Sequence, residues 1–132
     1  MKRVWFTPGI AVWILGLIFA TTVLAQAGRE VFVLAAEGPV SPAMLNYIER
    51  GLATARDQGA EAVIIELDTP GGQIDWSQSI VRAIVNSDVP VAVYIYPSGA
   101  YAASAGTFIT LAGHVAAMAP QSNDNNKIKS KV

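Results

Sequence analysis

The sequence predicts an α/β fold with a mostly parallel sheet. Three short runs rich in Val and Ile, at residues 31–35, 62–67 and 91–96, lack the clean polar–apolar alternation of a half-exposed strand. Such runs indicate strands covered on both faces, as in parallel sheets. A weaker apolar run follows at 114–118, and segments with helical spacing separate all four. The order β-α-β-α-β-α-β requires right-handed crossover connections and therefore a mostly parallel sheet.

Helical periodicity fills the gaps between these strands. Ser41 and Pro42 are a typical N-cap followed by proline at the first helical position, and Gly59 is suited to end that helix. A second helix precedes Pro90, and a third covers about 104–111. The apolar faces expected to be buried in the first two helices are Met44, Leu45, Ile48, Leu52 and Ala55, and then Ile74, Ile80, Val81, Ile84 and Val85.

Residues 1–27 are organised like a secretory signal peptide. A basic start at Met1–Arg3 precedes an uncharged apolar run at 10–24, and residues 25–27 (Ala-Gln-Ala) form a small-x-small cleavage pattern. The apolar run is shorter than the roughly 20 residues of a comfortable membrane span, and the alternatives are an uncleaved N-terminal anchor and a buried N-terminal helix. We therefore expect an exported, periplasmic or extracytoplasmic protein that is membrane-associated, with residues 28–120 as its folded domain.

The composition excludes several classes of function. The chain has no cysteine, which excludes disulfides, zinc–thiolate sites and a thiol nucleophile. Residues 28–120 carry nine acidic and four basic side chains, so they present no basic footprint for nucleic acid. No metal-ligand spacing, Walker loop or dinucleotide fingerprint occurs, and we expect neither a metal nor a cofactor. Glu66 and Asp68 could suggest a carboxylate pair, but a strand-end charge and a turn cap explain them better.

Two loops with unusual composition follow the second and third strands, at the carboxyl edge where α/β sheets place their sites. In the loop at 68–72, Gly71 and Gly72 can expose consecutive N–H groups to an anion. In the loop at 96–106, small residues surround Ser104 at the expected start of a helix. That position suits a nucleophile, because free helical N–H groups stabilise negative charge. The ordinary alternative for Ser104 is a helix N-cap. The ordinary alternative for the loop at 68–72 is a plain turn from strand to helix.

A nucleophilic serine needs a general base, and the sequence offers none nearby. His114 is the only histidine, and a structural role is the more common explanation for such a residue. No lysine lies between Lys2 and Lys127. The G-x-S-x-G elbow is also absent, which argues against an α/β-hydrolase.

Several motifs together resemble the NfeD family of membrane-associated serine proteases: ELDTPGG at 66–72, VPV at 89–91, YPSGA at 96–100, ASAGT at 103–107 and HVAAMAP at 114–120. The resemblance implies a ClpP/crotonase-like fold and a Ser-Lys dyad in which Ser104 is the nucleophile. It implies backbone oxyanion donors at Gly71, Gly72 and Ala105, and no metal or cofactor. It further implies a homo-oligomer that cuts apolar segments of stomatin-like partner proteins.

The chain departs from the family pattern after Pro120. The family's lysine lies some forty residues past the serine, beyond the last residue here, and Lys127, Lys129 and Lys131 fall in a polar tail at 121–132. We therefore expect a fold incomplete at its C-terminus, a disordered tail, and a truncated chain with little or no activity. Two alternatives remain: a non-catalytic peptide-binding or assembly module, and a crotonase-like acyl-CoA enzyme.

Overall fold

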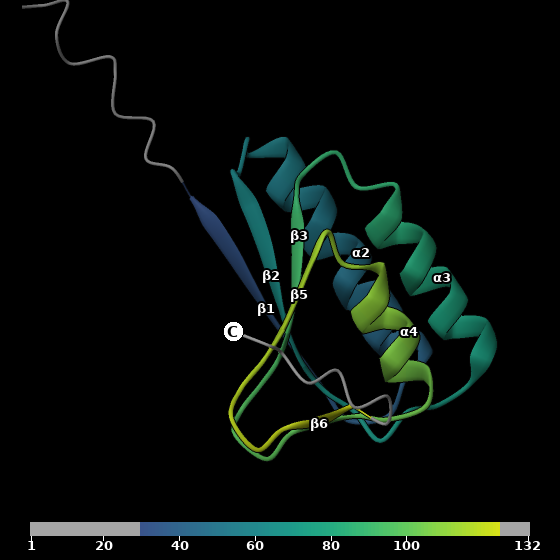
Figure 1. Ribbon diagram of the computed structural model, residues 1–132. Helices are drawn as coiled ribbons and strands as arrows, with labels where there is room; N and C mark the ends of the chain where they lie inside the picture. Colours follow the sequence, from purple (N-terminus) through teal and green to yellow (C-terminus); the bar gives the residue numbers. More distant parts are fainter. Residues whose placement is uncertain (1–29, 125–132) are drawn as a thin grey trace, which may run out of the picture.

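A four-stranded parallel sheet with three helices along one side forms the body of the computed structural model (Figure 1). It describes residues 30–124, so the expected signal peptide and the three tail lysines lie outside the described residues. The elements in chain order are β1 (Val31–Glu37), α2 (Pro42–Asp57), β2 (Ala62–Asp68), α3 (Ile74–Val85), β3 (Val91–Ile95), β4 (Tyr101–Ala102), α4 (Ala105–Ala112), β5 (Val115–Met118) and β6 (Asn123–Asp124).

The strand order β1-β2-β3-β5 follows the chain, and all three pairings are parallel. One row of the register runs across the whole sheet from Val33 through Ile64 and Ala92 to Val115. A helix after each of β1, β2 and β3 returns the chain to the edge of the sheet where the strands begin. The loops after β2 and β3 therefore both lie at the opposite, carboxyl edge. The predicted parallel α/β fold is confirmed.

Helix α2 forms where its capping residues and apolar spacing predict it. Ser41 Oγ accepts the N–H of Met44 at 3.4 Å, Pro42 is the first helical residue, and Gly59 follows the helix with φ +67°. That φ is left-handed and favours glycine, as the C-terminal stop requires. The five apolar residues predicted for its inner face are the five that are buried: Met44, Leu45, Ile48, Leu52 and Ala55.

Within residues 30–124 the helices cover only one face of the sheet, which differs from the expectation of two covered faces. Buried residues alternate with more exposed ones along β2 and β3, and Val31 and Val33 of β1 are 48% and 54% exposed. The helices pack against the other face, where Val63, Ile65 and Val93 are fully buried. Val and Ile are frequent in strands because their branched side chains suit a pleated surface, whether or not a second layer covers it.

Helix α3 also differs from expectation at its two ends. Its buried residues are Ser77, Ile80 and Ile84, whereas Ile74 and Val85 are 69% and 59% exposed. The predicted apolar face is therefore wider than the face that contacts the sheet. Its outer part turns toward α4 and lines a groove described below.

The short pairing of β4 with β6 was not predicted. Asn123 N–H donates to Ala100 O at 3.0 Å, and Ser98 Oγ donates to Pro120 O at 2.5 Å. Residues 121–124 thus pack on the loop that precedes α4, and the ordered chain continues past the expected boundary at Pro120. The expectation of a disordered tail differs from the structure in these four residues, because backbone pairing does not depend on apolar side chains. The rest of the tail lies outside the described residues.

The one-sided sheet predicts unequal effects of truncating neighbouring isoleucines on β2. Ile65→Ala should lower the free energy of unfolding by about 2–5 kcal/mol, because it opens a cavity in a fully buried position. Ile64→Ala, on the uncovered face of the same strand, is the matched control and should cost clearly less. Urea unfolding of both variants measures the difference, and equal losses would mean that both faces are covered in solution.

Candidate functional site

The loop after β2 and the loop before α4 are joined by backbone hydrogen bonds. Thr69 N–H donates to Tyr101 O at 2.6 Å, and Ala103 N–H donates to Thr69 O at 3.1 Å. The carboxylate of Asp68 adds a third link, since its Oδ1 accepts the N–H of Tyr101 at 2.9 Å. Asp68 was expected to cap its own turn, but its carboxylate instead binds the backbone of Tyr101, 33 residues away.

Gly71 lies directly against Ser104, so the structure brings together the two loops singled out from the sequence. A Cβ added at Gly71 would lie 2.8 Å from Ala103 O and 2.9 Å from Ser104 Cβ, and φ at Gly71 is +102°. Both facts require glycine, because a side chain would meet backbone that cannot move and would also strain its own residue. The close approach places Ser104 beside the glycine loop.

Ser104 precedes α4 but does not cap it. Its backbone has φ 53° and ψ −111°, its side chain makes no capping hydrogen bond, and the residue is exposed. An N-cap serine normally has extended backbone and accepts a helical N–H, as Ser41 does at α2. A positive φ at a residue other than glycine costs about 1–3 kcal/mol and tends to occur at functional sites. The ordinary N-cap explanation of Ser104 is therefore wrong.

Two backbone N–H groups beside Ser104 have no acceptor within residues 30–124. One belongs to Ala105, the first residue of α4, and the other to Gly72. The N–H of Gly71 is different, because it donates to Thr69 Oγ1 at 3.1 Å. Of the three donors expected from the family resemblance, Gly72 and Ala105 are thus available to a ligand, while Gly71 is already bonded.

Thr69 is the residue of this site that the sequence analysis missed. It is fully buried, and its side chain and backbone bond to both loops. A signal existed, since threonine hydroxyls commonly bond to the backbone two residues further on in turns. The loop at 68–72 was interpreted through its two glycines and the turn cap at Asp68 alone.

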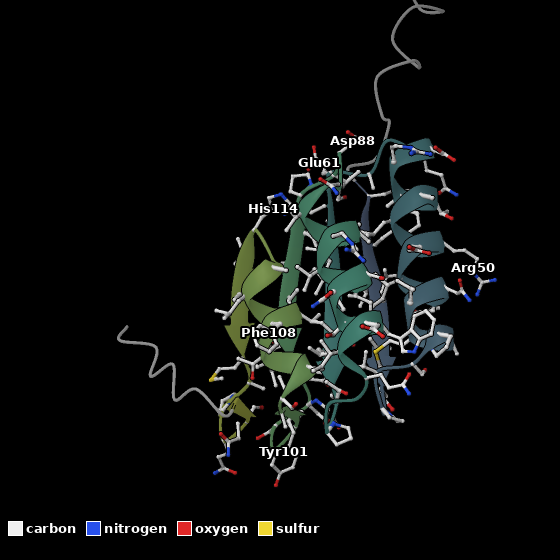
Figure 2. The ribbon with its side chains drawn as sticks, turned by 90° about the vertical axis from the view of Figure 1, so that its right-hand side faces the viewer. Arg50, Glu61, Asp88, Tyr101, Phe108 and His114 are labelled. Atoms are coloured by element: carbon white, nitrogen blue, oxygen red, sulfur yellow. The ribbon has the colours of Figure 1, made fainter. Side chains whose placement is uncertain are left out.

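His114 lies at the opposite end of the sheet from Ser104. Figure 2 shows it with Glu61 and Asp88 at one end of the molecule, while Tyr101 is at the other. Its Nδ1 accepts the N–H of Val91 at 3.2 Å, a structural role that joins the starts of β3 and β5. Residues 30–124 contain no lysine and, in the structure, no group of acidic or histidine side chains that could hold a metal.

An apolar groove of about 630 Å³ runs between α3 and α4 and begins next to the site. Ile74 and Phe108, two residues after Gly72 and four after Ser104, are 69% and 64% exposed. Phe108 is visible on α4 in Figure 2. The groove is lined by Ile74, Ser77, Gln78, Val81, Arg82, Val85, Phe108, Leu111 and Ala112.

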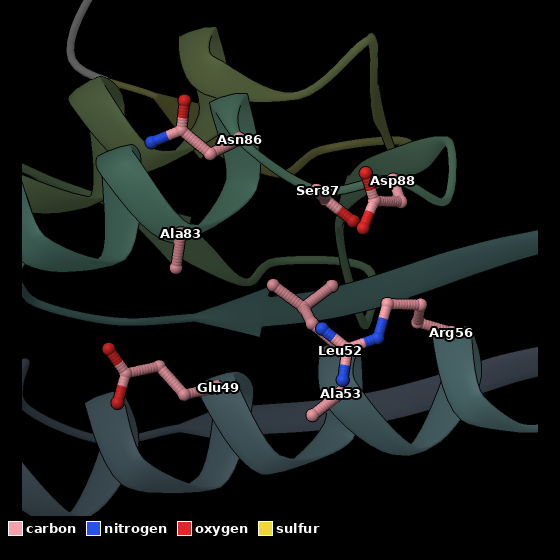
Figure 3. Close-up of a pocket in the computed structure, with 8 residues that line it drawn as sticks. All are labelled: Glu49, Leu52, Ala53, Arg56, Ala83, Asn86, Ser87 and Asp88. Atoms are coloured by element: carbon pink, nitrogen blue, oxygen red, sulfur yellow. The ribbon is translucent and has the colours of Figure 1, made fainter.

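A smaller hollow of about 160 Å³ lies between α2 and the end of α3 (Figure 3). Its charged side chains include Glu49, Arg56 and Asp88. Arg56 is held by Asp57, whose carboxylate accepts two of its hydrogen bonds at 2.8 and 2.9 Å and raises its pKa. The hollow includes Asp88, which Figure 2 shows at the opposite end of the molecule from Tyr101, so the hollow contributes nothing to the site.

Comparison with known proteins identifies the family. Residues 30–127 match the family described as NfeD1b, N-terminal domain. The chain belongs to this family. The membrane-bound protease PH1510 of Pyrococcus horikoshii is 46% identical over 105 residues, which are 79% of this chain and 23% of that protein. The chain therefore spans about a quarter of that relative.

Solved structures related to this NfeD1b domain share its fold. One is the 1510-N membrane-bound stomatin-specific protease, solved as a lysine-to-alanine mutant in complex with a substrate peptide. It is 44% identical, with a TM-score of 0.72 over 74% of this chain and 45% of that chain. ClpP1 from Listeria monocytogenes is 18% identical, with a TM-score of 0.64 over 70% of this chain and 54% of its own, and shows the ClpP-like fold alone. The family and fold inferred from the sequence motifs are confirmed.

The relatives are described as a membrane-bound protease and a membrane protein. Residues 30–124 contain no helix long and apolar enough to cross a bilayer. The expected signal peptide or anchor lies outside these residues.

The packing at Gly71 predicts that alanine there disturbs the site. Gly71→Ala should destabilise the domain by more than the roughly 1–2 kcal/mol of a strained φ, because its Cβ also meets the backbone at Ala103. Gly99→Ala is the matched control, since Gly99 has φ +87° but no heavy atom within 4 Å of the added Cβ. Thermal unfolding compares the two, and equal destabilisation would contradict the close contact with Ser104.

Proposed function

We propose that residues 28–120 are part of the catalytic domain of a serine endopeptidase and carry its nucleophile and oxyanion site. The observation that supports this most directly is the backbone of Ser104, which is strained at φ 53° and leaves the hydroxyl exposed and uncommitted. A capping or structural serine would gain nothing from this strain. A nucleophile gains from it, because the turn presents Oγ to a substrate at the start of a helix.

The proposed chemistry is acyl transfer to Ser104. Its Oγ attacks the scissile carbonyl carbon and loses its proton to a base, while the carbonyl oxygen becomes an oxyanion. The N–H groups of Gly72 and Ala105 donate to that oxyanion, and loss of one such donor costs about 3 kcal/mol in the barrier. The intermediate then collapses, the C–N bond breaks, and the protonated base gives its proton to the leaving amine.

The base comes from outside residues 30–124, which contain no lysine. A Ser-Lys dyad needs a lysine whose pKa burial lowers toward neutrality. An exposed lysine keeps a pKa of about 10.4 and is a poor base. We therefore propose that these residues supply the serine and the oxyanion donors, and that hydrolysis requires a lysine from elsewhere in the assembled enzyme.

We further propose the setting in which this chemistry would occur. The 1510-N relative is stomatin-specific, and by this likeness the substrate or partner is a stomatin-like membrane protein. The apolar groove beside Ser104 favours an apolar segment of that protein. The basic, apolar and small-residue order of residues 1–27 supports export to a periplasmic or extracytoplasmic site at the membrane, where the chain acts as a homo-oligomer.

Labelling of the assembled enzyme, with the lysine that serves as base present, by a fluorophosphonate probe tests the assignment of Ser104. The serine Oγ forms a bond to phosphorus, fluoride leaves, and the serine proton passes to solvent. The adduct should map to Ser104 by mass spectrometry and should be absent in Ser104→Ala. Ser98→Ala, which changes the other serine of the same loop, should label like the original chain. A Ser104 no more reactive than Ser98 would sink the proposal.

A second candidate function is a non-catalytic module that binds apolar peptides, and the groove between α3 and α4 favours it. In that case Ser104→Ala should leave peptide affinity unchanged, and no probe should react at Ser104. Phe108→Ser should weaken binding of a fluorescent apolar peptide about tenfold or more, since it removes a large contact surface. Val115→Ser, 60% exposed on β5, is the matched control and should bind normally. Equal affinity for both variants would exclude the groove.

A further inference from the structure

Thr69 is fully buried, and among residues 30–124 its hydroxyl bonds to Gly71 alone. Thr69 Oγ1 accepts the N–H of Gly71 at 3.1 Å and lies 3.4 Å from Gly71 O, to which it donates. Its backbone N–H and C=O are meanwhile bonded to Tyr101 and Ala103. Thr69 therefore holds both loops of the site: its side chain binds Gly71 in its own loop, and its backbone binds Tyr101 and Ala103 in the other.

These bonds determine the direction of the next peptide group. Gly71 O also accepts the N–H of Val40 at 3.0 Å, so the carbonyl of the Gly71–Gly72 peptide is held from two sides. In a planar trans peptide the N–H points opposite to the C=O. The N–H of Gly72 therefore points away from Val40, and it is this N–H that has no acceptor within the described residues.

We propose that Thr69 is a positioning residue that selects the oxyanion donor. Its hydroxyl occupies the N–H of Gly71 and orients the following peptide, so that Gly72 and Ala105 are left to bind the oxyanion. The role of these donors rests on the proposed protease function; the hydrogen bonding of Thr69 does not. Thr69 touches no substrate in this scheme and acts through the two glycines.

The two branches of the Thr69 side chain have separate partners, which allows a matched pair of variants. The hydroxyl bonds to Gly71, whereas the methyl Cγ2 lies 2.6 Å from the place where a Cβ at Gly106 would be. Thr69→Ser keeps the hydroxyl and loses the methyl. Thr69→Val keeps the shape and loses the hydroxyl. A merely space-filling role predicts that valine is tolerated better, and the positioning role predicts the reverse.

Amide hydrogen exchange followed by NMR tests the hydrogen bond without any need for activity. In the original chain the Gly71 amide should exchange at least about tenfold more slowly than the Gly72 amide. Thr69→Val should remove this protection, and Thr69→Ser should keep it. Equal exchange of the two glycines in the original chain would overturn the proposal even if the valine variant does not fold, and so would unchanged protection in Thr69→Val.

Labelling of Ser104 by a fluorophosphonate, in the assembled enzyme that contains the lysine base, tests the consequence for the oxyanion donor. Thr69→Val should lower the maximal labelling rate about tenfold or more without changing the half-saturating probe concentration, because only the reacting state uses the donor. Thr69→Ser should label within about threefold of the original chain. Unchanged labelling in Thr69→Val overturns the proposal. If Ser104 of the original chain fails to label, the protease assignment fails instead, and exchange still decides the role of Thr69.

Discussion

The backbone pairing of Thr69 with Tyr101 and Ala103 is the interaction on which the site depends. It joins two loops that leave adjacent strands of the sheet and that share no other backbone hydrogen bond within residues 30–124. Its bonds of 2.6 and 3.1 Å bring the glycine loop close enough to Ser104 that no side chain fits at Gly71. Buried backbone groups of this kind are costly to leave unpaired, so the two loops should separate only when the domain opens.

The one-sided arrangement of helices gives the site its surroundings. Helices α3 and α4 both begin at the carboxyl edge of the sheet, two residues after Gly72 and one residue after Ser104, and then run side by side (Figure 1). Their outer apolar residues therefore start at the site and extend away from it as a continuous groove. The proposed acyl-transfer site and the apolar groove are adjacent because the same two helix starts position both.

The sequence was sufficient for the parts of the molecule that local physics determines. The capping residues and apolar face of α2 appear as expected, because cap chemistry and helical spacing act within a few residues. Ile74 and Val85 were misjudged, since periodicity shows that a face is apolar but not which layer covers it. The same limit explains the open face of the sheet. The motif resemblance, by contrast, led correctly to the family and the ClpP-like fold.

The details of the site could not be derived in this way, because they depend on residues far apart in the chain. Nothing local to Thr69 shows that it pairs with Tyr101 and Ala103, more than 30 positions later. The pairing of residues 123–124 with β4 is likewise a contact made only in the folded domain. The backbone of Ser104 follows from where α4 and Gly71 are held, so the sequence left its two roles open.

The strain at Ser104 also bears on how this position can change over evolutionary time. Glycine would adopt φ 53° without penalty, so stability alone selects glycine here, while the proposed acyl transfer would select serine. A lineage released from catalysis would gain about 1–3 kcal/mol from a single substitution. The amino acid found at 104 in other members would therefore separate those still under selection for chemistry from those kept only for their fold.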